Sequence, residues 1–452
     1  MKSKYLKRLI TLAVLAGSST FAFGQFSVDG QLITRGEYRH GYKTLADSNQ
    51  APAAFTEQRT RLIFGYKGDN YKIGISFQDI RTWGSTAQNN KVDGLTSVHE
   101  AYVDWNACSK GSFKIGRQEL VYDDHRIFGN VDWTMEARSH DIALFKFIPD
   151  TMTQLHVGLA WNQDAAQLTT NYYTLGSAAS GFQNYKSMQF LWFNRRIGTD
   201  MNVSILALNN GLQYDWTDSN AITFHHVEFS QTAGANFVYK KDAMGFHFNA
   251  YYQMGNDGRY KQTDGITAKT LSAYEVAADF TYTVNKKYGV TIGGEMISGN
   301  SQTDTTKAYK NVNHAFNPFY GTNHKFNGYM DYFYVGNHTN NVGLINPYLK
   351  LKYDAEKYWV GLDVHYFMSA APVLDVPNLI KTGKYEAMSS GLGTEIDLTY
   401  AYKISKQATI QAGYSHMLGT DTMKALKGGK TNVTSNWAYL MFAFKPTLFK
   451  EK

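Results

Sequence analysis

The stretch FSVDGQLITRGEYRH, residues 26–40, alternates between two kinds of side chain. Even positions from Phe26 to Tyr38 are apolar or small, whereas odd positions are polar or charged, with Ile33 as the exception. Successive side chains of a strand point to opposite faces, so the pattern predicts a strand with one apolar and one charged face. Such a strand is much longer than the roughly 5–6 residues typical of globular proteins.

The same alternation recurs along the chain. It is clear in residues 55–66, 71–79, 151–161, 245–254, 273–284 and 394–402. A soluble β-sandwich also alternates, but its inner face is the apolar one and its strands are shorter. Long strands that are apolar on one face and polar on the other are typical of a membrane barrel around an aqueous lumen.

The links between the predicted strands alternate in length. Eight are short, at residues 67–70, 107–111, 149–150, 197–199, 240–244, 285–287, 354–357 and 404–407. Nine are long and polar, near residues 41–54, 82–96, 121–137, 163–184, 210–227, 256–269, 299–342, 370–390 and 419–434. Short turns on one side and long loops on the other are typical of bacterial outer-membrane barrels. Tyrosines cluster beside the short turns, as expected at a membrane interface.

The sequence therefore predicts an all-β fold: one transmembrane antiparallel β-barrel of 18 strands over residues 26–445, with short periplasmic turns and long extracellular loops. Residues 326–336 also alternate like a strand. Counting them would give an odd number of strands and move the C-terminus to the wrong side, so we assign them to a folded loop. Abundant Tyr (32) and Phe (27) with scarce Pro (7) agree with strands rather than with two or three mixed soluble domains.

Residues 1–24 have the features of a secretory signal peptide: a basic start, an apolar run and small residues at the end. We place cleavage after Gly24, which leaves residues 25–452 as a single outer-membrane barrel. The apolar run is too short to span a bilayer as a helix. The chain has 45 basic residues, and without the four in this segment 41 basic residues remain against 38 acidic residues. That excess is too small to indicate a nucleic-acid partner.

A barrel of roughly 16–18 strands is wide enough for a water-filled lumen. We expect residues 121–137 to fold into this lumen and narrow it, because the segment is too charged to face lipid and yet contains Ile127, Phe128 and Trp133. Residues 299–342 form a second candidate for a loop folded into or over the lumen. Basic residues dominate the lumen-facing positions of the first three strands, and acidic residues dominate those of the later strands. This separation of charge predicts an electric field across the lumen.

Several segments resemble the alginate-export family of outer-membrane proteins in its Bacteroidetes-type form. They are residues 57–84, 99–105, 113–133, 135–145 and 323–337. The resemblance implies an 18-stranded barrel whose arginine-rich constriction conducts an anionic polysaccharide, flanked by loops that open and shut. The positions it carries over are Arg59, Arg61, Asp79, Arg81, Trp83, Arg117, Gln118, Asp124, Arg126, Trp133, Arg138 and Asp141.

These observations predict a pore that passively conducts an anionic or polar saccharide. Arginine suits the constriction because it stays charged and can hold a carboxylate with two hydrogen bonds. The candidate pore-lining residues are Arg35, Arg59, Arg61, Arg81, Arg117, Arg126 and Arg138. Arg117 shares the parity of Phe113 and Ile115, so a bulge is needed to turn it inward. We expect no cofactor and no metal, and a monomeric barrel surrounded by outer-membrane lipid and lipopolysaccharide, with periplasmic partners if it exports.

Other interpretations remain open. Arg59 and Arg61 could instead pair with Glu57 and Glu37 and brace the inner wall. The barrel could be a general or nutrient-uptake porin for small polar solutes, or a surface protein whose long loops bind a partner. Residues 123–126, DDHR, place carboxylates beside a histidine, but no nucleophile motif accompanies them, so we predict no enzyme. The adjacent histidines of residues 224–228, FHHVE, face opposite ways on a strand and make a poor metal site.

Overall fold

The computed structural model describes residues 25–91, 94–176, 184–218, 220, 222–333, 338 and 341–451. The predicted signal peptide, residues 1–24, lies outside these residues, and so does the end of the segment 326–336. The described part of that segment is a loop, as predicted. No helix within the described ranges is long and apolar enough to cross a membrane.

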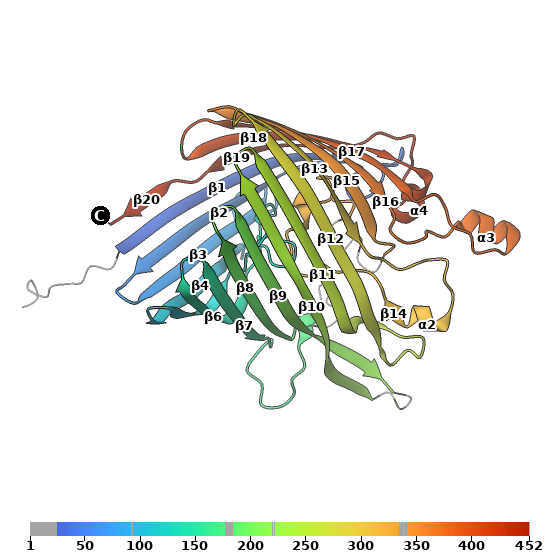
Figure 1. Cartoon of the computed structure of the whole chain (residues 1–452), viewed down its shortest axis with the longest axis horizontal. Coiled ribbons are helices and arrows are strands. Elements are labelled where there is room, and N and C mark those ends of the chain that lie inside the picture. The colour runs from blue at the N-terminus through green and yellow to red at the C-terminus, as the bar shows by residue number, and fades with distance from the viewer. Residues whose placement is uncertain are drawn as a thin grey trace, which may run out of the picture.

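One closed sheet makes up the molecule (Figure 1). Its first strands are Gln25–His40 (β1), Ala53–Lys67 (β2), Tyr71–Thr82 (β3), Thr96–Cys108 (β4), Gly111–Gln118 (β5), His140–Asp150 (β6), Thr153–Trp161 (β7), Ser187–Ile197 (β8), Met201–Thr217 (β9) and Thr223–Lys241 (β10). They are followed by Met244–Lys261 (β11), Ala268–Val284 (β12), Tyr288–Ile297 (β13), Leu344–Asp354 (β15), Tyr358–Met368 (β16), Gly391–Lys403 (β17), Ala408–Gly419 (β18) and Ser435–Phe444 (β19).

These strands form the predicted antiparallel barrel of 18, which closes where β1 pairs with β19. Two further strands are accessory: β14 (Val312–Asn313) pairs with β12 inside a loop, and β20 (Thr447–Lys450) pairs with the start of β1. Short helices occur in the loops, at Thr174–Gly176, Lys307–Lys310 (α2), Asn323–Lys325, Val376–Thr382 (α3) and Asp421–Lys427 (α4). Figure 1 shows β1 and β20 side by side at one end and α3 projecting at the other.

The two faces of the strands differ as the alternation predicts. On β2, Leu62 on the outer face is 42% exposed, whereas Arg59 and Arg61 on the inner face are buried. Tyr66 and Tyr71 lie 5.9 Å apart between ring centroids beside one short turn, and Tyr288 and Tyr353 lie 5.0 Å apart beside others. These four tyrosines therefore lie at the periplasmic rim, where a membrane interface favours aromatic residues.

The main departure concerns two of the long loops. Residues 210–227 and 256–269 are largely strand, because β9 and β10 extend to Thr217 and Thr223, and β11 and β12 extend to Lys261 and Ala268. The prediction of long loops there was wrong. A strand that continues beyond the lipid needs no apolar face, so the polar sequence concealed its pairing.

Candidate functional site

Residues 119–139, which join β5 to β6, cross the interior of the barrel; we call them the first lumen loop. Trp133 accepts a hydrogen bond at its carbonyl from Arg35 of β1 (2.6 Å). Asp123 accepts one from the indole Nε1 of Trp192 on β8 (3.1 Å) and one from Ser204 on β9. Because β1 and β9 lie far apart around the barrel, the loop spans the lumen.

Three wall arginines from adjacent strands hold the first lumen loop. Arg59, 0% exposed, donates to Asp132 (2.7 Å) and to the carbonyls of Thr134 and Met135 (both 3.3 Å). Arg61 donates to Gln78 of β3 (2.6 Å), which in turn donates to the carbonyl of Glu136 (3.0 Å).

Arg35 completes this group. Its guanidinium lies 4.2 Å from the ring centroid of Trp133 and pairs with Glu37 (2.7 Å) and Glu57 (3.3 Å). The alternative in which Glu37 and Glu57 pair with Arg59 and Arg61 is therefore wrong. Arg35 reaches both carboxylates because it lies directly opposite Glu57 and two residues before Glu37 on the same face of β1.

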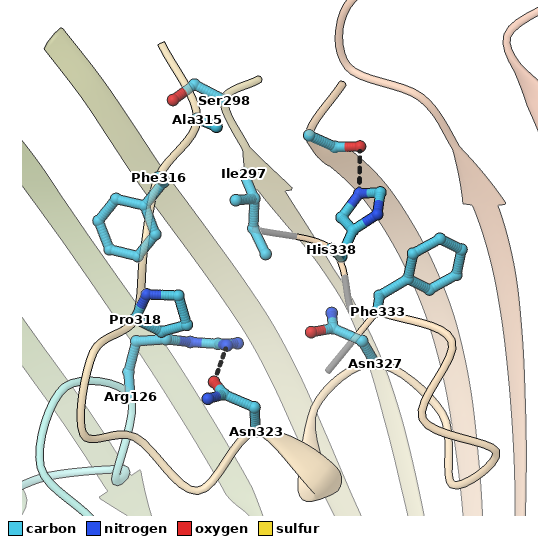
Figure 2. A pocket seen from close by; sticks show the side chains of 11 residues that line it. Arg126, Ile297, Ser298, Ala315, Phe316, Pro318, Asn323, Asn327, Phe333 and His338 are labelled. Atoms are coloured by element: carbon cyan, nitrogen blue, oxygen red, sulfur yellow. Dashed lines mark hydrogen bonds between the residues drawn. The ribbon is translucent and has the colours of Figure 1, made fainter. Parts of the chain in front are cut away.

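Arg126, in the first lumen loop, reaches the opposite wall. Its guanidinium is 2% exposed and forms an ion pair with Glu295 of β13, while Glu275 of β12 lies 3.8 Å away. Burial disfavours the charge on Arg126, but these two carboxylates outweigh it and raise the pKa of the guanidinium. Figure 2 shows Arg126 beside Pro318 and donating to Asn323, which belong to residues 298–343.

Residues 298–343, which join β13 to β15, form the second lumen loop, described here except for 334–337 and 339–340. Its backbone pairs with the first lumen loop: Gly129 N–H donates to the Tyr320 carbonyl and Thr322 N–H to that of His125, both at 2.9 Å. Arg138 donates to the Gly321 carbonyl (3.1 Å). A Cβ added at Gly321 would lie 2.2 Å from the Arg126 carbonyl oxygen, so this close contact requires glycine.

The two loops pack as one body, which we call the lumen plug. Phe128 and Tyr320 stack at 5.7 Å between ring centroids, and Trp133 stacks on His324 at 4.6 Å. The cavity between Arg126 and the second loop has a volume of about 20 Å³, room for roughly one water molecule (Figure 2). Little free space therefore remains between Arg126 and the second lumen loop.

The inner wall behind the plug is apolar, which the sequence interpretation missed. Met188, Phe190 and Trp192 of β8 are buried on the inner face, and Leu191 on the outer face is 41% exposed. A strand that is apolar on both faces needs lipid on one side and protein on the other. Inward-facing apolar residues on β6, β8 and β9 were thus a readable signal of a plug; they are Ile142, Leu144, Met188, Phe190, Trp192, Leu206 and Leu208.

The first lumen loop also holds an unusual backbone. Asp123, His125, Val131 and Ala137 all have positive φ, between 51° and 72°. Such a conformation is rare for a β-branched residue such as Val131 and persists only when surrounding contacts impose it. Burial also raises the pKa of the Asp123 carboxyl, although hydrogen bonds from Ser204 and Trp192 oppose the shift. The loop is thus held in one conformation by its partners on the wall.

Arg81 and Arg117 lie apart from the other five arginines. Arg81 pairs with Asp79 (2.6 Å). Both lie on the same face of β3 as Phe77, which is 43% exposed on the outside of the barrel. Arg117 pairs with Asp141 (2.9 Å), and the two side chains are 42% and 64% exposed. Arg81 and Arg117 lie outside the lumen, because no bulge in β3 or β5 turns either side chain inward. The structure brings together at the plug the other five arginines, Arg35, Arg59, Arg61, Arg126 and Arg138.

A family model described as alginate export matches residues 25–434. The chain belongs to the alginate export family. No match is found among curated proteins. Family and fold together identify an outer-membrane pore of a Gram-negative bacterium, and both are those of transport porins rather than of enzymes.

Solved structures share the fold of this alginate export family member at low identity. Acinetobacter baumannii OccAB4 has a TM-score of 0.59 at 10% identity, covering 94% of this chain and 98% of its own. Pseudomonas aeruginosa OpdL has a TM-score of 0.58 at 11% identity, covering 94% and 99%. P. aeruginosa OpdQ has a TM-score of 0.57 at 11% identity, covering 94% and 98%.

Changing Arg59 and Arg61 together to Ser is expected to shift the reversal potential in a salt gradient towards cations, because two positive charges leave the wall. The change also removes the donors to Asp132, Thr134 and Met135, so the baseline current should become noisier. Planar-bilayer recordings measure both effects. Arg117→Ser is the matched control and should change neither, since Arg117 lies on the outer face. If the double variant kept the ion preference of the parent, both arginines would support the loop without setting the ion selectivity.

Proposed function

We propose that the barrel passively conducts an anionic or polar saccharide across the outer membrane. The observation that carries this proposal is the lining of the periplasmic half of the lumen, where charged groups of both signs occupy facing walls. Sugar hydroxyls donate and accept hydrogen bonds, so a lining of both signs suits them better than a uniformly positive one. These residues are Lys72, Asp104, Lys114 and Lys146 on β3 to β6, and Asp279, Lys350 and Asp363 on β12 to β16.

The lining is partly neutralised by its own ion pairs. Lys146 pairs with Asp104, and Lys350 with Asp363 at 3.2 Å. A partly neutralised wall attracts a solute weakly at many points, which allows release as well as binding. Membership of the alginate export family supports a saccharide as the solute.

A second candidate is a porin for small polar solutes. It is favoured by the two loops that cross the lumen and by fold similarity to P. aeruginosa OpdK, solved with vanillate (TM-score 0.55, 10% identity, covering 93% of this chain and 98% of that chain). In this case a small aromatic acid, rather than a sugar, would occupy the lumen.

Planar-bilayer recordings separate the two candidates. Oligosaccharides of uronic acids, uncharged oligosaccharides of equal length and vanillate are added in turn to the purified barrel. The saccharide proposal expects concentration-dependent interruptions of the ion current by oligosaccharides, with the uronates acting at the lower concentration. Interruptions by vanillate alone would reject it in favour of the second candidate.

A further inference from the structure

A cavity of about 260 Å³ lies on the periplasmic side of the lumen plug. Its ceiling combines both lumen loops, with Asp124 and Arg126 from the first and Lys325 and Phe326 from the second. Its wall consists of residues on β11, β12, β13 and β15. The volume is close to the lower end of the roughly 300–1,000 Å³ of small-molecule sites.

Lys325 is the cation of this cavity without an ion pair among the described residues, and its ammonium lies 5.0 Å from the ring centroid of Phe326. It ends the short helix Asn323–Lys325, and its side chain is exposed to the lumen while its neighbours Asn323 and His324 are buried. Among the residues that the structure describes, no carboxylate lies within 4.0 Å of the Lys325 ammonium. By contrast, Arg126 is paired with Glu295, and Lys350 with Asp363.

The ceiling and the wall of the cavity also offer hydrogen-bond acceptors, Asp124 in the first lumen loop and Asp279 on β12. Asp124 accepts from Asn249 (2.6 Å), and its side chain is 14% exposed. Asp279 lies 3.2 Å from His247 and 3.5 Å from the Tyr348 hydroxyl, with 22% of its side chain exposed. Carboxylates are acceptors only, so they suit the hydroxyl donors of a sugar ring. The rings of Phe326 and Tyr348 complete the lining with apolar surface.

We propose that this cavity is a binding subsite for a single carboxylated sugar residue, reached from the periplasm. Lys325 binds the carboxylate, and Asp124 and Asp279 accept hydrogen bonds from ring hydroxyls. This subsite rests on the proposed saccharide transport. It adds which residues bind the sugar and that the sugar enters from the periplasmic side. It also separates the roles of the basic groups: the wall arginines hold the plug, whereas Lys325 meets the solute.

The test compares the purified barrel with Lys325→Met in planar bilayers, with digalacturonate or cellobiose added on the periplasmic side. The concentration of digalacturonate that halves the current is expected to rise about tenfold in K325M, since a hydrogen bond between charged partners is lost. Block by uncharged cellobiose is expected to stay unchanged. Lys325→Arg keeps the charge and should restore most of the block by digalacturonate.

Lys381→Met, on α3 outside the lumen, removes one lysine as a matched control and should behave like the parent. Heat-modifiable migration confirms that each variant is folded. If digalacturonate blocks the parent and K325M equally, the subsite is wrong while saccharide conduction stands. If neither saccharide interrupts the current of the parent, the proposed function itself is wrong.

Discussion

Deletion of residues 123–134 is expected to raise the single-channel conductance of the barrel several-fold. These residues cross the lumen, and among them Ile127 and Phe128 are 2% and 1% exposed. Their removal also frees the second lumen loop, which loses its contacts to the His125 carbonyl and to Phe128. The barrel itself should persist, because its closure depends on strand pairing and on the apolar outer face.

The control deletion is residues 375–386, which have the same length and include α3. Its helix α3 projects from the barrel rim (Figure 1), and among the described residues no hydrogen bond joins the segment to the lumen plug. Its removal should leave the conductance as in the parent. Both deletion variants should retain heat-modifiable migration. An unchanged conductance after deletion of 123–134 in a folded barrel would mean that this segment does not limit the current.

The barrel could be predicted from sequence because a two-residue period is a local property. Where a strand crosses the lipid, its side chains must alternate between apolar and polar. A shift by one residue would turn the charged side chains into the membrane. The same period marked Arg35, Arg59 and Arg61 as inward, where the structure has them. It failed above the membrane, at β9 to β12, where lipid no longer imposes an apolar face.

The partners of the arginines could not be predicted in the same way. The contact of Arg59 with Asp132 joins a strand to a loop 73 residues away, and nothing periodic links them. For Arg117 the period indicated the outer face, whereas the family resemblance suggested the lumen, and Arg81 was placed in the lumen by the resemblance alone. The structure follows the period, because turning either side chain inward would require a bulge that the strand pairing at that residue lacks.

Arg126→Met is expected to unlock the lumen plug. Removing one partner of a buried ion pair leaves uncompensated charge and costs about 3–5 kcal/mol. Glu295 and Glu275, 5% and 0% exposed, would then carry buried negative charge without a cation. Water can relieve this strain if the loops move away, so the open state gains population. Bilayer recordings should show large current fluctuations, and hydrogen exchange of residues 119–139 should accelerate.

A rescue variant separates this electrostatic explanation from simple loss of packing. Adding Glu275→Gln and Glu295→Gln to Arg126→Met removes the unpaired buried charges, which are the source of the cost in the single variant. The triple variant should therefore return to a quiet current and slow exchange, although the cation–π contact of Arg126 with Phe326, at 3.6 Å, remains lost. If the triple variant fluctuates as strongly as Arg126→Met alone, packing against Phe326 and Asn323 holds the plug, and the paired carboxylates do not.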